Sequence, residues 1–220
     1  MAQSPLLEGL PAAEARRVLS EARERQLDKG EILFHQDEAA EALHVVTEGR
    51  VRLTQLTAEG QEVVVRLCGP GEVFAGIAAL DGKAYPFTAA AAEPSRVLLW
   101  RRAALQELFR AVPRLQANVL EIVGAHAREM LDRFREMATE PVPRRLARAL
   151  LRLVPRERPG QDDALIVGVT QQDLAEMAGT TLYTVSRVLS EWEAIGAVTT
   201  GRGRVHVRSL GRLQEIAEAR

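Results

Sequence analysis

The chain has 220 residues, of which 46% are hydrophobic and 27% charged, enough apolar material for one or two domains with real cores. Its net charge of −1 does not suggest a nucleic-acid partner. The net charge is −3 for residues 1–138 and +2 for residues 139–220, however, so the C-terminal part has the sign that DNA binding requires. Cys68 is the only cysteine, which excludes an intrachain disulfide and a four-cysteine iron–sulfur cluster.

No targeting or membrane segment is expected. Residues Met1–Pro5 lack a basic start followed by an apolar run, which a signal peptide would need. No apolar stretch reaches the roughly 18 to 20 residues that cross a bilayer. We therefore expect a cytoplasmic protein without a membrane partner.

Residues 30–100 have the pattern of many short strands. Apolar and β-branched runs such as Val63–Val65 and Val97–Trp100 are separated by glycine turns. The glycines that recur at intervals of about 10 to 20 residues are Gly30, Gly49, Gly60, Gly71 and Gly82. This pattern predicts a small jelly roll, a β-roll domain over residues 1–105.

Residues 103–138 predict one long helix, because Gly124 and Pro113 are its only glycine and proline. Apolar residues recur every three or four positions, and we assign residues 106–139 to a dimerisation helix whose seam pairs with a second copy. The seam consists of Leu115, Val119, Ile122, His126, Met130, Phe134 and Met137. The alternative is that this row packs on the β-domain of its own chain.

Residues 140–220 form a second domain after the break at Glu140–Pro143. Thr170 and Asp173 have the spacing of a capping box, and Gly179 suits a tight turn. Thr180 or Thr181 can cap the helix that follows, in which a buried stripe of Val185, Val188, Leu189, Trp192 and Ile195 is expected. Two short helices around a glycine turn predict a helix-turn-helix.

A β-hairpin is expected after the second helix. The segments Ala197–Thr200 and Arg204–Arg208 flank Gly201–Gly203, so Arg202 and Arg204 lie at the tip, where they can follow a phosphate backbone as a wing does. The alternative is a charged hairpin in solvent. The complete pattern predicts an α+β fold with a β-roll, a long helix and a winged helix-turn-helix.

The whole chain resembles the cyclic-AMP receptor/fumarate-nitrate regulator (CRP/FNR) family of bacterial transcription factors. The resemblance rests on Lys29–Phe34, Glu48–Leu53, Gly69–Phe74, Arg144–Leu153 and the helix-turn-helix segment. It implies a homodimer whose long helices pair, a signal sensed in the β-roll, binding to double-stranded DNA and contact with RNA polymerase.

Departures from the family pattern concern the effector. The glutamate that holds the ribose in cyclic-AMP-binding members falls on Gly76, and the phosphate-binding Arg-Ser pair falls on Pro86 and Phe87. The polar pair of the long helix falls on Met130 and Leu131. Cyclic AMP is therefore not the expected effector, and an unknown small molecule remains. The residues expected around its pocket are Gly71, Glu72, Phe74, Gly76, Tyr85, Pro86, Phe87, Thr88, Met130, Leu131 and Phe134.

On the DNA side, Arg187 aligns with the family's base-reading arginine and would bind guanine through O6 and N7. Tyr183 stands where the family has a glutamate, which predicts an altered base preference, or a phosphate contact through its hydroxyl. The complete set expected at DNA is Thr170, Gln171, Thr181, Leu182, Tyr183, Ser186, Arg187, Ser190, Arg202 and Arg204.

Three alternatives remain. A haem could be held by His44 or His126, giving a haem-dependent regulator, or the protein could be constitutively active. A cupin-type metalloenzyme would need clustered ligands, and the four histidines lack that spacing. A ligand-sensing module that never binds DNA is the third alternative, and the helix-turn-helix motif argues against it.

Overall fold

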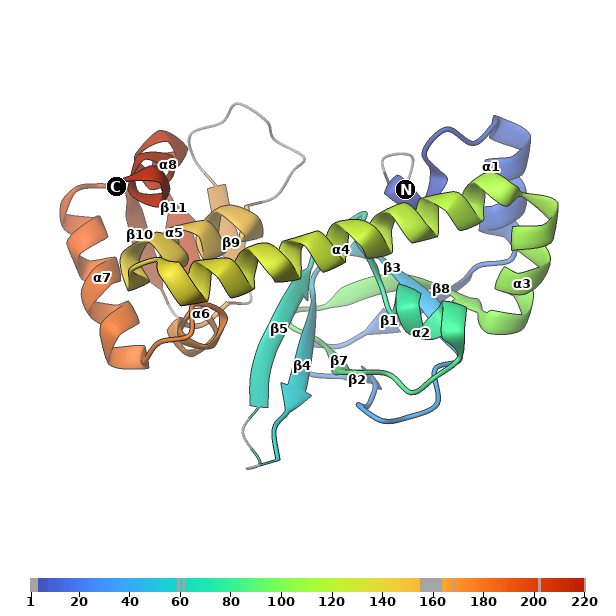
Figure 1. The fold of residues 1–220 in the computed structure, drawn as a ribbon, viewed down its shortest axis with the longest axis horizontal. Helices are drawn as coiled ribbons and strands as arrows, with labels where there is room; N and C mark the ends of the chain where they lie inside the picture. The colour runs from blue at the N-terminus through green and yellow to red at the C-terminus, as the bar shows by residue number, and fades with distance from the viewer. Residues whose placement is uncertain are drawn as a thin grey trace. The chain divides into compact units, whose positions relative to one another are not determined.

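The computed structural model describes residues 4–58, 60, 62–154, 164–167, 169–201 and 203–219, with the exception of the side chains of residues 78 and 164–167. Figure 1 follows the elements along the chain. They form two compact units, one made of Met1–Glu62 with Arg66–Met130 and the other of Val63–Val65 with Leu131–Arg220.

The first unit is built around two antiparallel four-stranded sheets with the strand orders β1-β8-β3-β6 and β2-β7-β4-β5. Its strands are β1 (Arg23–Leu27), β2 (Ile32–Phe34), β3 (Ala42–Glu48), β4 (Val51–Leu56), β5 (Glu62–Cys68), β6 (Val73–Phe74), β7 (Thr88–Ala91) and β8 (Ser95–Arg101). Its helices are η1 (Pro5–Leu7), α1 (Ala12–Ser20), α2 (Gly76–Asp81), α3 (Arg102–Ala111) and the first part of α4 (Pro113–Thr139). The predicted β-roll is confirmed.

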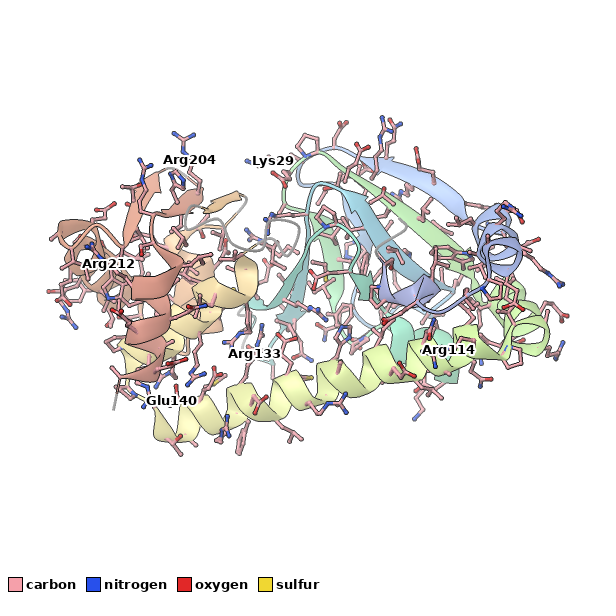
Figure 2. All side chains as sticks on the ribbon, turned by 90° about the horizontal axis from the view of Figure 1, so that it is seen from above. Lys29, Arg114, Arg133, Glu140, Arg204 and Arg212 are labelled. Atoms are coloured by element: carbon pink, nitrogen blue, oxygen red, sulfur yellow. The ribbon has the colours of Figure 1, made fainter. Side chains whose placement is uncertain are left out.

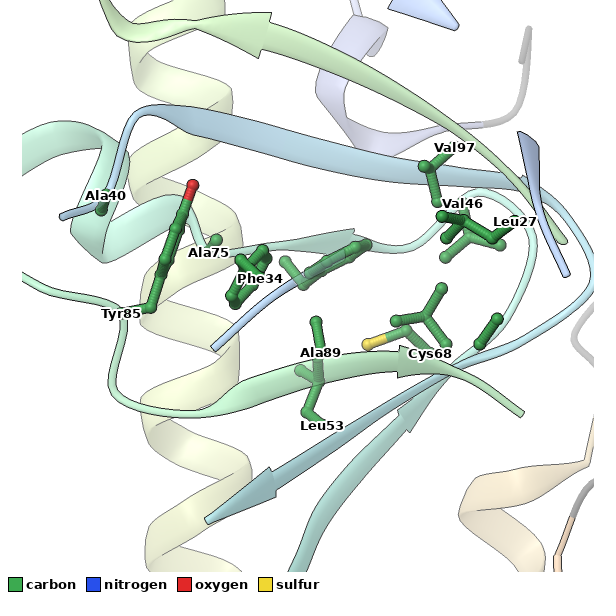
Figure 3. Close-up of a cluster of buried hydrophobic side chains, with 13 residues drawn as sticks. Leu27, Phe34, Ala40, Val46, Leu53, Cys68, Ala75, Tyr85, Ala89 and Val97 are labelled. Carbon is green, nitrogen blue, oxygen red and sulfur yellow. The ribbon is translucent and has the colours of Figure 1, made fainter. Parts of the chain in front are cut away.

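The space between the two sheets is a hydrophobic core, part of which Figure 3 shows. Phe34 stacks on Tyr85 with ring centroids 3.7 Å apart and lies 6.2 Å from Phe74. The Tyr85 hydroxyl accepts hydrogen bonds from the Glu41 and Ala42 backbone amides. Cys68 is fully buried in the same core. Aromatic rings thus fill the interior of the roll.

A second core covers the outer face of the sheet that contains β3. Side chains alternate along a strand, so Leu43 and Val45 face this core while His44 and Val46 face the roll interior. Helices α1, α3 and α4 contribute most of the other apolar side chains of this core, and Leu6, Val73, Ala79 and Trp100 also belong to it. Trp100 is fully buried there and donates from its indole nitrogen to the Val18 carbonyl, 2.7 Å away.

The expected long helix is present as α4, but it does not run unbroken over residues 103–138, because α3 ends at Ala111 and α4 begins at Pro113. Proline has no amide hydrogen to donate to the preceding turn, so it stops one helix but suits the first position of the next. Val112 between them is buried and adopts non-helical angles.

The second unit holds the last part of α4 and seven further elements. They are α5 (Val142–Leu153), β9 (Ala164–Val167), α6 (Gln171–Met177), α7 (Leu182–Ala194), β10 (Val198–Gly201), β11 (Arg204–Val207) and α8 (Leu210–Glu218). The strands form an antiparallel sheet in the order β10-β11-β9. The predicted helix-turn-helix and the hairpin after it are both present.

Candidate functional site

The first helix of the helix-turn-helix begins with the predicted capping box. The Thr170 hydroxyl accepts from the Asp173 amide at 3.1 Å, and the Asp173 carboxylate accepts from the Thr170 amide at 2.7 Å. These two bonds satisfy backbone donors that a helix end leaves open. They fix the first residue of α6, Gln171, which is half-buried.

The turn between α6 and α7 is held by an arginine that sequence reasoning missed. Gly179 adopts φ +59°, as expected for the turn glycine. Arg145 of α5 donates to three backbone carbonyls: Nε to Ala178 at 2.8 Å, Nη2 to Gly179 at 3.1 Å and Nη1 to Glu140 at 2.8 Å. One guanidinium therefore ties the helix-turn-helix turn to the corner between α4 and α5. No local signal marks it among the arginines of α5.

We expect Arg145→Ala to lower the free energy of unfolding of the second unit by about 2 kcal/mol, because three charge-assisted but partly exposed hydrogen bonds disappear. Urea titration followed by circular dichroism measures this loss, and amide exchange at Gly179 and Thr180 should accelerate. Arg144→Ala is the matched control, since Arg144 donates one hydrogen bond to a carbonyl, that of Ala217 at 3.3 Å. Equal losses in the two variants would contradict a special role for Arg145.

The end of α4 is fixed to α5 by ion pairs. Glu136 is 5% exposed, and both of its oxygens accept from Arg152 at 3.0 Å. Glu140 accepts from Arg148 at 3.0 Å and lies 3.6 Å from a guanidinium nitrogen of Arg144. Ion pairs as well as proline residues therefore fix the corner between α4 and α5.

Thr181, one of the two predicted caps, is the N-cap of α7, and its hydroxyl accepts from the Thr184 amide at 3.2 Å. The expected buried stripe of α7 is confirmed at Val185, Val188, Leu189 and Trp192. It is wrong at Ile195, which is 52% exposed because α7 ends at Ala194.

The exposed face of α7 carries the residues predicted to contact DNA: Leu182, Tyr183, Ser186, Arg187 and Ser190. Arg187 pairs with Glu191 one turn further along the helix, at 2.6 Å, and both side chains are about half exposed. The Ser190 hydroxyl donates to the Ser186 carbonyl at 3.0 Å. Glu191 is a further polar group of this face that the sequence analysis did not single out.

The β10–β11 hairpin carries Arg204, which is exposed and projects from the ribbon in Figure 2. A Cβ atom on Gly201 would lie 2.8 Å from the Nε atom of Arg204, so glycine at this position leaves room for the arginine. Gly203 adopts φ +66° at the tip. Arg202, also predicted at DNA, lies outside the described residues.

The predicted dimer seam is corrected in its first half. Leu115, Val119 and Ile122 are buried in the core of their own unit, and His126 is half-buried on the same side of α4 as Val119. Met130, Phe134 and Met137 are 63%, 74% and 51% exposed. Val119 and Met137 are 18 residues apart, which is five turns of helix, so they face the same direction. The physical reason for their different exposure is that the residues α4 contributes to the first unit's core end at Val123.

The exposed apolar face of α4 follows a different row, spaced alternately by three and four residues. We call it the front row; it consists of Ala117, Leu120, Gly124, Ala127, Leu131, Phe134 and Ala138. Leu120, Leu131 and Phe134 are 54%, 69% and 74% exposed. Val119, on another side of the helix, is buried in the core of the first unit.

The residues predicted for the effector pocket differ in their exposure. Phe74 and Tyr85 are buried in the aromatic core, while Met130, Leu131 and Phe134 are exposed on α4. The carboxylate of Glu72 accepts from Arg66 and from the Gly69 amide, both at 2.7 Å. Phe74 and Tyr85 both pack against Phe34, and the effector pocket stays a prediction.

The remaining predicted pocket residues have structural contacts. Gly71 takes φ +83°, and the Thr88 hydroxyl accepts from the Gln36 amide at 3.0 Å. Gly76 lies so close to α4 that a Cβ atom would sit 3.3 Å from Val123. The Pro86 carbonyl accepts from Gln55 at 3.4 Å, and Phe87 packs on the core.

His44 is the most perturbed titratable group of the first unit. It is 3% exposed, stacks 5.1 Å from Phe74, and its Nδ1 atom has no hydrogen-bond partner among the described residues. Burial, followed by the nearby positive charge of Arg25, lowers the pKa of the imidazole to about 3. A hollow of about 510 Å³ opens beside His44 and Tyr85.

We expect the stability of the first unit to fall as the pH drops below about 6.5. The unfolded chain binds a proton on His44 near 6.5, whereas the folded imidazole stays neutral down to about 3, so acid favours the unfolded state between these values. Urea titrations should show a loss of about 2 kcal/mol from this group between pH 7 and roughly pH 5. His44→Phe keeps the aromatic packing and should remove this part of the loss; an unchanged pH dependence would contradict the assignment.

Neither a metal-binding cluster nor a membrane-spanning helix occurs among the residues that the structure describes. No three His, Cys, Asp or Glu side chains of this part of the chain come together in a group that could hold a metal ion. None of its helices is long and apolar enough to cross a membrane.

Comparison with known proteins identifies both units. The cyclic nucleotide-binding domain matches residues 24–111, and the Crp-like helix-turn-helix domain matches residues 144–216. The cyclic AMP receptor protein of Thermus thermophilus is 34% identical over 217 residues, covering 99% of this chain and 98% of that protein.

Solved structures agree with this result. A CRP/FNR-family transcriptional regulator from Thermus thermophilus has a TM-score of 0.71 at 25% identity, covering 90% of this chain and 100% of that one. FixK2 from Bradyrhizobium japonicum shares the fold, with a TM-score of 0.78 at 24% identity over 90% of this chain and 98% of that one. The chain therefore belongs to the CRP/FNR family of transcription regulators.

Proposed function

We propose that the protein is a homodimeric transcription regulator that binds a pseudo-palindromic DNA operator. The observation that carries this proposal is the exposed face of α7, which presents Arg187 and two serines from a helix whose start is capped and whose preceding turn is bonded. In this proposal Arg204 on the adjoining hairpin contacts a DNA phosphate, and Arg202 contacts a further phosphate along the same strand.

Further contacts position the domain on the duplex. Thr170, Gln171 and Thr181 lie at the first turns of α6 and α7. Helix N-termini carry free backbone amides and a partial positive charge, so they favour phosphate groups. In this proposal these residues bind phosphates while Leu182, Tyr183, Ser186, Arg187 and Ser190 face the base pairs.

Dimerisation is supported by the front row of α4. Apolar residues alternately three and four positions apart are the pattern of a two-stranded coiled coil. Leu120, Leu131 and Phe134 of this row are exposed. Two parallel copies of α4 would place the recognition helices roughly 34 Å apart, one turn of DNA. The chain then divides into a sensor domain over 1–105, a dimerisation helix over 106–139 and a DNA-binding domain over 140–220.

The first unit is proposed as the sensor, with a signal other than cyclic AMP. The relative from Thermus thermophilus is named a cyclic AMP receptor protein. In this chain, however, Pro86 and Phe87 replace the phosphate-binding pair, and the Phe34, Tyr85 and Phe74 rings fill the roll interior. An effector would shift the equilibrium between DNA-competent and incompetent arrangements. A protein that is active without an effector is the second candidate, favoured by the same filled interior.

The proposal is tested by DNA binding at two salt concentrations. The full-length protein should select a two-fold symmetric site from a random duplex library, and its affinity for that site should fall by roughly 10³ to 10⁵ between 50 and 200 mM salt if six to ten phosphates are neutralised. Native mass gives the oligomeric state, and an absorption spectrum tests for haem. An absence of salt-dependent binding to any duplex would overturn the proposal and favour an interaction module.

The effector part has its own test. Adding cyclic AMP should leave both the unfolding temperature and the operator affinity unchanged, since a ligand that binds the folded state must raise its stability. A rise in the unfolding temperature together with tighter operator binding would show that the aromatic interior opens to admit a nucleotide. Regulation of RNA polymerase would follow from operator binding and is measured by transcription from a promoter that carries the selected site.

A further inference from the structure

Two apolar side chains stand exposed at the beginning of α7, on the face proposed to contact DNA. Leu182 is 49% exposed and Tyr183 is 78% exposed. The larger apolar residues that follow them in α7 are buried, from Val185 to Trp192, each at most 5% exposed. The first two residues of this helix therefore break the otherwise complete separation of apolar and polar faces.

Both residues are in line with the polar groups of the exposed face. Residues four apart on a helix lie one above the other, so Leu182 heads the row of Ser186 and Ser190. Tyr183 heads the parallel row of Arg187 and Glu191. Further along these rows the polar groups bond to each other, since Arg187 pairs with Glu191 and Ser190 donates to the Ser186 carbonyl.

The position of these two residues is fixed by the structure around the turn. Thr181 caps the helix through the Thr184 amide, and Arg145 holds the carbonyls of Ala178 and Gly179 immediately before it. The N-terminal residues of a recognition helix are the ones that meet base edges. Leu182 has no group that can form a hydrogen bond, so its complement in the major groove must be apolar.

We propose that Leu182 and Tyr183 recognise thymine through its 5-methyl group, next to the guanine contacted by Arg187. The thymine methyl is the apolar group that a base pair presents in the major groove. This inference rests on the proposed DNA binding and specifies part of it: each half-site contains A·T pairs under the start of α7. The Tyr183 ring adds apolar area at this position, whatever its hydroxyl contacts.

The test removes single methyl groups from DNA. The full-length protein first selects its site from a random duplex library, and duplexes of that site are then made with deoxyuridine in place of individual thymidines. Burial of one methyl group predicts an affinity loss of about fourfold for each sensitive thymine. Leu182→Ala should bind thymine more weakly than the wild type and bind the thymine and deoxyuridine duplexes equally at the position it contacts. Tyr183→Ala should do the same at a neighbouring position.

Two controls separate this contact from other effects. Ile195→Ala removes an equally exposed apolar side chain at the opposite end of α7 and should leave the methyl sensitivity unchanged. Tyr183→Phe should retain the sensitivity, because the ring remains. Equal affinities of the wild type for thymine and deoxyuridine at every position would overturn the inference, as would a sensitivity that survives both alanine variants. In either case salt-dependent binding to the selected duplex would remain, whereas failure of the proposed function would abolish that binding itself.

Discussion

Phe134→Glu is expected to convert the protein from dimer to monomer and to lower its operator affinity by roughly 10² to 10⁴, the gain that linking two binding modules provides. Phe134 is 74% exposed in the front row of α4. In a two-fold symmetric coiled coil the same residue approaches its own copy, so the substitution places two carboxylates against each other in an apolar seam. A monomer retains one recognition helix and one half-site.

Sedimentation equilibrium and binding to the selected duplex measure the two effects in the same samples. Ala125→Glu is the matched control, because it adds the same charge at another exposed position of α4 outside the front row. The control should remain dimeric with unchanged affinity. A dimeric Phe134→Glu protein would show that another surface holds the two copies together.

The seam predicted for α4 combines residues that the structure buries with residues that it exposes. The predicted seam contains three successive steps of four residues, Ile122 to His126 to Met130 to Phe134. At 3.6 residues per turn each step of four rotates the row by about 40°, so Ile122 and Phe134 lie about 120° apart around the helix. Ile122 therefore faces its own unit's core while Phe134 faces outward. Residues spaced alternately by three and four positions stay on nearly the same side of the helix. More than one such row can be drawn on α4, and only the burial of Leu115 and Val119 shows which row is exposed.

The helix-turn-helix was predictable because its determinants are local. The capping box, the positive-φ glycine and the buried stripe each depend on residues within one or two turns of the chain. Arg145 was not predictable in this way, since its acceptors at Ala178 and Gly179 lie more than thirty residues along the chain. Long-range hydrogen bonds of this kind leave no spacing pattern in a sequence.

The aromatic packing in the region of the expected effector pocket was not predictable for a related reason. The resemblance supplied the positions of a family binding site, and the residue types at Gly76, Pro86 and Phe87 already argued against a cyclic phosphate. The packing there depends on three strands and one connecting segment at once: Phe34 on β2, His44 on β3, Phe74 on β6 and Tyr85 before β7 meet in one aromatic cluster. Side-chain packing between strands that are distant in sequence cannot be derived from the alternation within any one of them.

Arg187→Ala is expected to lower operator affinity by roughly 30-fold to 10⁴-fold, because each half-site loses a guanine contact that contributes about 1–3 kcal/mol. Its pairing with Glu191 contributes little to folding, since both side chains are about half exposed, so the variant should unfold at nearly the wild-type denaturant concentration. The paired carboxylate instead restricts the guanidinium to the exposed face of α7. Replacing individual guanines with 7-deazaguanine removes the N7 acceptor and should weaken the wild type at one position of each half-site.

The Arg187→Ala protein should not distinguish guanine from 7-deazaguanine at that position, and this lost distinction assigns the contact to Arg187 rather than to a general loss of charge. Arg110→Ala is the matched control, because Arg110 is an exposed arginine that forms an intrahelical pair with Glu107 on α3, outside the proposed DNA surface. It changes net charge equally and should retain both affinity and the N7 dependence. If Arg187→Ala and Arg110→Ala bind the selected duplex alike, Arg187 contacts neither guanine nor phosphate, and the base specificity comes from the first turn of the recognition helix.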